Sequence, residues 1–324
     1  MSWFSLVVSA WCGCNGPEAV LPTGDTDVPT DSDADGDTDA DGDTDTDTAT
    51  TDPTTAPCAA YAPAMSMGVV ENTDYTELSG IVPSRQNPGV LWTHEDSGGA
   101  AELYALDTAG TTVATLTVEG VVADDWEDLA IGPCDSGWCL TIGDIGTSGT
   151  ARTEFVVLVV TEPLLDGTQS EYSVEAEVRP YTYPDGAEDA EALAVTPDGT
   201  PVVITKRTDA TAGVYTLPAG ATVLEWVSEI STGSADEDIT ARVTAADLWP
   251  DQSRLLVRTY FHLYEFDGTD LADLGAPQEL SYALEVQGEA VAYDPTARGF
   301  WQVSEGVSPT LWFTGCAEDT TARP

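Results

Sequence analysis

Between Cys58 and Cys316 the chain alternates short apolar runs with turns rich in Gly, Pro, Asp and Thr. The runs lack the 3.6-residue period of a long amphipathic helix, so the pattern predicts an all-β domain. Five runs share one form, in which small and aliphatic residues follow a residue whose side chain carries an oxygen. They are Ser79–Val82, Glu127–Ile131, Glu191–Val195, Thr244–Leu248 and Glu289–Tyr293.

Each of these segments begins a repeat, and successive repeats start 48, 64, 53 and 45 residues apart. A second apolar strand follows in each repeat, at 90–93, 140–142, 202–205, 255–257 and 300–303. A third follows at 103–106, 157–160, 214–217, 263–266 and 311–313, and four repeats also contain a fourth. Radial repetition of four-stranded antiparallel units predicts a five-bladed β-propeller. The 64-residue spacing leaves room for further strands, so a six-bladed ring stays open as the alternative.

The fifth repeat ends after three strands, and the segment Tyr61–Val70 is expected to supply its fourth strand from the N-terminal side. Cys58 and Cys316 would then meet where the ring closes, and a disulfide between them would fit an oxidising compartment. Cys134 and Cys139 flank a four-residue turn, so we expect them to cross-link one hairpin.

The first 14 residues read as an export signal. The apolar run Trp3–Trp11 is too short to span a bilayer, and Cys14 follows Gly13 as in the lipobox of bacterial lipoproteins. Lipidation at Cys14 would hold the protein on the outer membrane or cell surface, and plain secretion is the alternative. We therefore expect an extracytoplasmic protein that meets a membrane only through a lipid anchor.

Residues 15–57 form an Asp- and Thr-rich segment without apolar periodicity, which predicts an extended, disordered spacer. The spacing of Asp31, Asp33, Asp35 and Gly36 resembles the first half of an EF-hand loop, but Gly42 stands where the bidentate Glu is needed. Weak calcium binding by the spacer remains the alternative. The propeller domain is expected at 58–316, and a disordered tail at 317–324.

The chain has 57 acidic and 10 basic residues, a formal net charge of −47. Only 13 of the acidic residues lie in 17–57, so the folded part is strongly acidic as well. Such a surface repels phosphates, which excludes nucleic acid as a partner, and it attracts metal cations. It also favours a soluble monomer.

The residues that begin the inner strands of a propeller converge on its central channel. Here they comprise three carboxylates and two hydroxyls: Ser79, Glu127, Glu191, Thr244 and Glu289. Like charges at one point favour a cation, and Ca²⁺ accepts 6–8 oxygen ligands in flexible geometry. Alternatively, these side chains cap backbone groups without a metal.

In this order the five residues resemble the calcium-activated nucleotidase (apyrase) family of five-bladed propellers, in which one residue per blade holds calcium in the order Ser, Glu, Glu, Ser, Glu. Thr244 departs from that pattern. Three segments resemble a group of uncharacterised bacterial secreted propellers: Trp126–Ala130, Ile142–Gly146 and Tyr183–Gly186. The first resemblance implies a central calcium and a phosphate-ester or anhydride hydrolase, and the second implies the fold alone.

About 15 residues after each anchor, a second ring is expected at one mouth of the channel. It consists of His94, Asp144, Lys206, Arg258 and either Ser304 or Glu305. Lys206 is the only lysine in this acidic chain. A metal with cations and a histidine can bind and attack a phosphoryl or carboxylate group, whereas the alternative is a salt-bridge network.

Two functions follow. The first is a surface-tethered module that binds an unidentified ligand or protein at the propeller face, with calcium as a structural element. The second is a calcium-dependent hydrolase of phosphate esters or anhydrides, in which His94, Asp144, Lys206, Arg258 and Glu305 are the catalytic candidates. No Ser-His-Asp triad or zinc motif is apparent, and fold alone assigns no activity.

Overall fold

The computed structural model describes residues 56–96, 98–147, 152–233 and 239–317. They form a β-propeller of five sheets, each with four antiparallel strands at its core. The first two blades are β2 (Leu78–Pro83), β3 (Val90–Glu95), β4 (Glu102–Asp107) and β5 (Thr112–Glu119), then β6 (Trp126–Cys134), β7 (Gly137–Asp144), β8 (Phe155–Thr161) and β10 (Glu177–Tyr181). The predicted export signal with Cys14, the spacer except for residues 56–57, and the C-terminal tail except for residue 317 lie outside the described residues.

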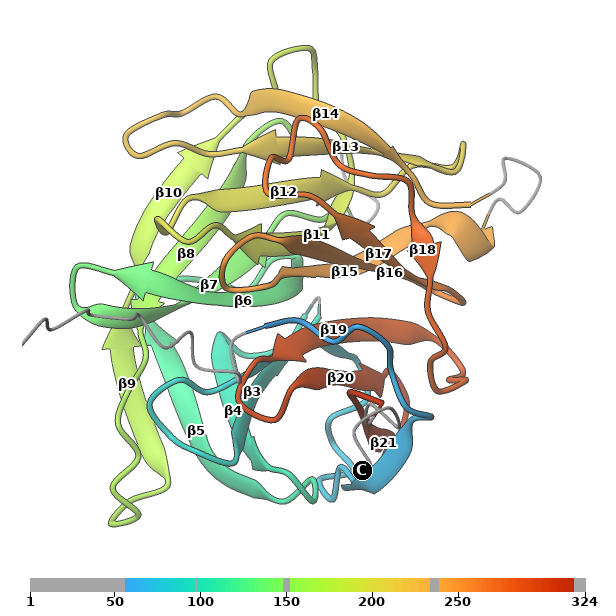
Figure 1. Cartoon of the computed structure of the whole chain (residues 1–324). Coiled ribbons are helices and arrows are strands. Elements are labelled where there is room, and N and C mark those ends of the chain that lie inside the picture. Colours follow the sequence, from blue (N-terminus) through green and yellow to red (C-terminus); the bar gives the residue numbers. More distant parts are fainter. Residues whose placement is uncertain (1–55, 97, 148–151, 234–238, 318–324) are drawn as a thin grey trace, which may run out of the picture. The chain divides into compact units, whose positions relative to one another are not determined.

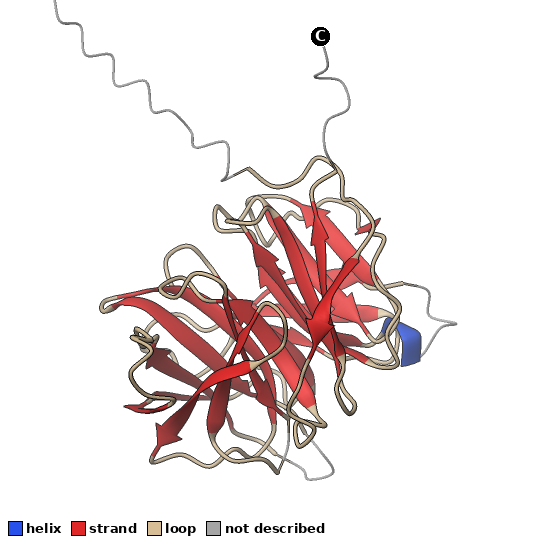
Figure 2. Cartoon of the chain, turned by 90° about the horizontal axis from the view of Figure 1, so that it is seen from below, coloured by secondary structure: helices blue, strands red, loops and turns tan. Residues whose placement is uncertain are grey.

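The next two blades follow in chain order, as the colours of Figure 1 show. They are β11 (Ala190–Val195), β12 (Pro201–Thr205), β13 (Thr211–Thr216) and β14 (Glu225–Ser231), then β15 (Val243–Leu248), β16 (Arg254–Thr259), β17 (Leu263–Asp267) and β18 (Gln278–Glu279). Residues 239–241 form a short 3₁₀ turn, the blue segment of Figure 2. Within the described residues no helix has the length and apolar character needed to cross a membrane.

Blade 5 confirms the predicted closure of the ring. Its own strands are β19 (Gly288–Asp294), β20 (Gly299–Ser304) and β21 (Thr310–Gly315), and the N-terminal strand β1 (Met65–Val69) pairs antiparallel with β21. The Cys58–Cys316 disulfide lies beside this pairing, and Cys134–Cys139 cross-links the β6–β7 hairpin. The first closes a loop of 258 residues and, on the chain-entropy model, contributes about 5 kcal/mol.

The long interval between the second and third anchors holds an excursion and no sixth blade. After β8 the chain crosses to blade 1, where β9 (Glu171–Glu175) pairs parallel with the outer strand β5. It then returns as β10, which pairs with β8. Five blades are therefore complete, and blade 1 carries a fifth strand.

The core lies between neighbouring blades around the axis. The inner strands β2, β6, β11, β15 and β19 contact one another in sequence, and β19 contacts β2. Trp92, Trp126 and Trp249 are fully buried between these sheets. Small residues such as Ala192, Ala245 and Ala290 are fully buried in the inner strands.

Every inner strand carries a β-bulge close to its first residue. In four blades the ladder skips the residue singled out from sequence, namely Glu127, Glu191, Thr244 or Glu289. A bulge re-aims one side chain out of the regular alternation. The repeated bulge therefore turns these residues toward the mouth of the tunnel, defined here as the end at which the inner strands begin.

Candidate cation site at the mouth of the central tunnel

Blade 1 is offset from the sequence alignment by one residue. Its ladder pairs Ser79 with His94 and skips Gly80, so Gly80 occupies the bulge position. Gly80 has a φ of 54°, and an added Cβ would lie 2.7 Å from His94 Nε2. Only glycine fits there, because the His94 ring fills the space that a side chain would need.

Three glutamates from blades 2, 3 and 5 influence one another at the mouth. Burial, followed by repulsion from the Glu191 and Asp96 carboxylates, holds the pKa of Glu127 well above its usual value. Burial and the Glu191 carboxylate do the same to the pKa of Glu289. Burial raises the pKa of Glu191 to about 7, although Lys206 acts against it. These side chains resist ionisation together, as expected for like charges that share a poorly solvated site.

Among the described residues, three carboxylates gather on the blade 2 side of the mouth. One oxygen each from Asp96, Asp125 and Glu127 lies within 4.8 Å of the others. Asp125 and Glu127 are almost fully buried. Both pack against Gly146, where an added Cβ would lie 1.8 Å from Glu127 Oε1 and 2.4 Å from Asp125 Oδ2. Glycine at this position therefore leaves the room that the two carboxylates occupy.

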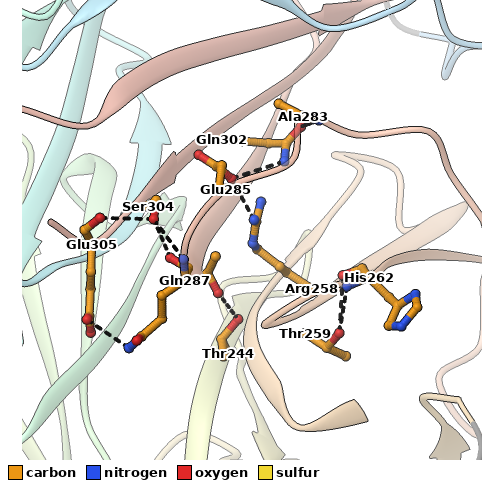
Figure 3. Close-up of polar contacts among 11 residues, drawn as sticks. Thr244, Arg258, Thr259, His262, Ala283, Glu285, Gln287, Gln302, Ser304 and Glu305 are labelled. Carbon is orange, nitrogen blue, oxygen red and sulfur yellow. Dashed lines mark hydrogen bonds and ion pairs between the residues drawn. The ribbon is translucent and has the colours of Figure 1, made fainter. Parts of the chain in front are cut away.

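The two hydroxyl residues of the predicted metal set bond to the neighbouring inner strand. Ser79 Oγ donates to the Glu127 carbonyl oxygen, and Thr244 Oγ1 donates to the Gly288 carbonyl oxygen at 2.8 Å (Figure 3). Both therefore join adjacent blades. A hydroxyl that donates its hydrogen keeps lone pairs for a cation, so this arrangement is compatible with either role.

The two cations of the predicted second ring are engaged within the protein. Lys206 Nζ forms an ion pair with Glu191 and lies 2.7 Å from the Tyr260 hydroxyl. Arg258 is 1% exposed and pairs with Glu285 at 2.6 Å. Its guanidinium lies against Gly288, where an added Cβ would be 1.8 Å from Nη2. Arg258 therefore lies between blades 4 and 5, and only Lys206 contacts a glutamate of the mouth.

The other second-ring residues have different environments. His94 is fully buried, and its Nδ1 lies 2.9 Å from the Glu95 carbonyl oxygen. Because a carbonyl only accepts, Nδ1 carries the hydrogen, and Nε2 has no hydrogen-bond partner among the described residues. Burial lowers the pKa of His94 to about 4, so the ring is neutral. Asp144 pairs with Arg152 at 2.7 Å.

Ser304 and Glu305 both contact Gln287, which lies just before β19. Ser304 Oγ donates to the Gln287 carbonyl oxygen at 2.5 Å. The Gln287 amide donates to Glu305 at 2.7 Å and to Glu289 at 2.9 Å. Burial, then repulsion from Glu77 and Asp96, raises the pKa of Glu305 to about 7. Glu305 therefore belongs to the same acidic field as the tunnel glutamates.

Two buried carboxylates of the inner strands were not singled out from the sequence. Asp128 accepts the backbone N–H groups of Leu129 and Leu193 at 2.8 Å and of Ala246 at 3.2 Å. It thus joins the inner strands of blades 2, 3 and 4. Asp247 similarly accepts the N–H groups of Leu248 and Tyr293 at 2.8 Å each. A charged residue inside an otherwise apolar inner strand was the available signal.

Comparisons with protein-family models and with curated proteins found no match. Among solved structures, the PQQ-bound aldose sugar dehydrogenase of Streptomyces coelicolor aligns over 80% of this chain and 99% of its own, with 11% identity and a TM-score of 0.47. A chain of the mitotic checkpoint complex aligns over 72% of this chain and 60% of its own, with 15% identity and a TM-score of 0.37. Similarity this low concerns the fold alone, and neither comparison carries an argument about activity.

Proposed function

We propose that the chain is an extracytoplasmic, surface-tethered binding module whose propeller holds a calcium ion at the tunnel mouth. The observation that supports this most directly is the group formed by Asp96, Asp125 and Glu127, whose oxygens lie within 4.8 Å of one another. Two more glutamates of raised pKa, Glu191 and Glu289, belong to the same field. A divalent cation would relieve the repulsion among these carboxylates.

The chemistry of the donors fits calcium. Every side chain of the group presents carboxylate oxygens, which hard cations such as Ca²⁺ prefer to softer nitrogen and sulfur ligands. Asp96, Asp125 and Glu127 would hold the ion directly. Glu191 and Glu289 would complete the charge around it, and the Ser79 and Thr244 hydroxyls would be the neutral members of the set.

Calcium titration of the metal-free full chain tests this proposal. Isothermal titration calorimetry is expected to give at least tenfold weaker binding for Glu127→Gln and for Asp125→Asn, equivalent to about 1.4 kcal/mol or more. Each change removes a charge with little change in shape. Glu171→Gln is the matched control, because Glu171 is exposed on the added strand β9. Wild-type affinity in both Glu127→Gln and Asp125→Asn would refute the central site.

The surface tether is a separate part of the proposal and rests on the sequence around Cys14. In a bacterial host that processes lipoproteins, the wild-type chain is expected in the membrane fraction and Cys14→Ser in the soluble fraction. The measurement is an immunoblot of the two fractions. Equal partitioning of both proteins would favour plain secretion.

The hydrolase is the less favoured function, because Lys206 and Arg258 already pair with Glu191 and Glu285. A phosphate ligand would have to compete with these carboxylates for its cations. Assays with p-nitrophenyl phosphate and with a nucleoside diphosphate distinguish the two functions. Turnover that a calcium chelator abolishes and Lys206→Ala lowers would favour the hydrolase over the binding module.

A further inference from the structure

An apolar surface lies beside the acidic mouth on blade 5. Within the loop 281–287, Leu284 is 82% exposed and Val286 is 90% exposed. Val307, in the turn between β20 and β21, is 66% exposed. These aliphatic side chains, together with Pro309 and Trp312, line a groove of about 380 Å³.

Buried polar contacts hold the loop 281–287 in the conformation that exposes its apolar side chains. Glu285, which stands between Leu284 and Val286 in the sequence, pairs with Arg258 at 2.6 Å (Figure 3). Its side chain is 3% exposed. Gln302 donates to the same carboxylate at 3.4 Å and accepts the Ala283 N–H at 3.3 Å. With Glu285 held in this way, Leu284 and Val286 on either side of it remain exposed.

The groove is acidic at the end that meets the tunnel. Glu305 lines it and shares the Gln287 amide with the tunnel residue Glu289. Repulsion from Glu77 and Asp96 reaches the same carboxylate. A cationic group placed there would favour the ionised form of Glu305 and pair with it.

We propose that this groove docks a segment of a partner protein in which basic residues alternate with aliphatic ones. The aliphatic side chains would cover Leu284, Val286 and Val307, and a Lys or Arg would reach Glu305. Charge argues against the other occupants. A second copy of this chain, at a net charge of −47, and its own Asp-rich spacer would both be repelled from the acidic end. The inference goes beyond the calcium site and does not depend on it.

Calorimetric titration with two synthetic peptides tests the docking surface. The probes are acetyl-Lys-Leu-Lys-Leu-Lys-amide and its serine counterpart acetyl-Lys-Ser-Lys-Ser-Lys-amide, added to the full chain in a buffer with a calcium chelator. We expect the leucine peptide to bind at least tenfold more tightly than the serine peptide. Leu284→Ser/Val286→Ser is expected to remove that difference, and Glu305→Gln to weaken both peptides several-fold. Added salt should weaken binding as well.

The matched control is Val122→Ser/Leu164→Ser. These residues are 81% and 66% exposed and lie outside the groove, so wild-type binding is expected. Equal affinity for both peptides, or wild-type binding by Leu284→Ser/Val286→Ser, would overturn the proposal. A wild-type dimer that becomes monomeric in Leu284→Ser/Val286→Ser would also overturn it, because the groove would then bind a second copy. So would wild-type binding to phosphatidylcholine vesicles that this variant loses, because the groove would then bind a membrane. Because the chelator keeps calcium out of the assay, these results do not depend on whether the proposed calcium site exists.

Discussion

Asp128→Ala is expected to lower the free energy of unfolding by about 3–5 kcal/mol. The Asp128 carboxylate is fully buried and accepts backbone N–H groups from three inner strands. Alanine would leave those donors without a partner in a place that excludes bulk water. Each buried unsatisfied donor costs about 1–3 kcal/mol. In a domain of this size the melting temperature should fall by roughly 10 °C.

A second effect acts against this loss. Burial holds the pKa of Asp128 well above its usual value, and the backbone N–H groups act in the opposite direction. Removing the side chain therefore also removes a poorly solvated charge. We expect the three unsatisfied donors to outweigh that relief, since they belong to three separate blades and no single rearrangement serves them all.

Asp128→Asn separates the two effects. The amide has nearly the same shape and no charge, but it offers one acceptor oxygen and turns an NH₂ group toward a backbone donor. If the hydrogen bonds dominate, Asp128→Asn destabilises the domain as well. If the buried charge dominates, it stabilises. Urea unfolding measures both variants, with the exposed-turn variant Asp185→Ala as control. Melting of Asp128→Ala within about 2 °C of wild type would contradict the three-strand role.

Short-range pattern was sufficient to predict the propeller. Near the start of each inner strand, an oxygen-bearing residue is followed by small and aliphatic ones. This motif occurs once per blade, five times in all. Cys58 and Cys316 flank the first and last strands, so their pairing followed from the closure of the ring. The excursion through β9 was not predictable, because its parallel pairing with β5 depends on contacts far apart in the sequence.

The site was predictable only in part, for reasons of register. Aligning Ser79 with Glu127 assumed equal strands, but the bulge in blade 1 falls on Gly80. In the same way, Thr205 and Thr259 are the ladder equivalents of His94, one position away from Lys206 and Arg258. A shift of one residue along a strand places the side chain on the opposite face of the sheet.

The remaining carboxylates come from loops and from buried strand positions. Asp96 follows β3 and Asp125 precedes β6, and no sequence spacing relates them. Their proximity arises because blades 1 and 2 are neighbours around the axis. Asp128 and Asp247 stand inside apolar strands, where a carboxylate would ordinarily be excluded. The two aspartates could therefore have been noticed in the sequence, but the sequence does not show which strands donate hydrogen bonds to them.

The stability of the metal-free protein is expected to rise by on the order of 1 kcal/mol as the pH is lowered from 8 to 6. Burial raises the pKa of Glu191 to about 7 and that of Asp247 to about 6, both well above the usual values. The folded state therefore binds these protons more tightly than the unfolded chain. Their stabilisation is full below the unfolded pKa and is lost as the pH rises through the folded one.

One group opposes the trend at the lower end of this range. Burial lowers the pKa of His94 to about 4, well below its usual value. Below about pH 6.5 the His94 imidazole binds a proton in the unfolded chain but not in the folded state, which favours unfolding. The carboxylates are more numerous, since Glu127 and Glu289 also have pKa values well above normal. The net direction between pH 8 and 6 is therefore stabilisation on acidification.

Calcium should remove most of this pH dependence, because the ion and the protons neutralise the same carboxylates. The rise in melting temperature caused by saturating Ca²⁺ is expected to be several degrees larger at pH 8 than at pH 6, and binding should release protons at neutral pH. Differential scanning calorimetry at both pH values, with and without Ca²⁺, provides the measurement. Glu191→Gln should flatten the metal-free profile, whereas Glu171→Gln should leave it unchanged. An equal calcium shift at both pH values would mean that the ion binds away from the glutamates of raised pKa.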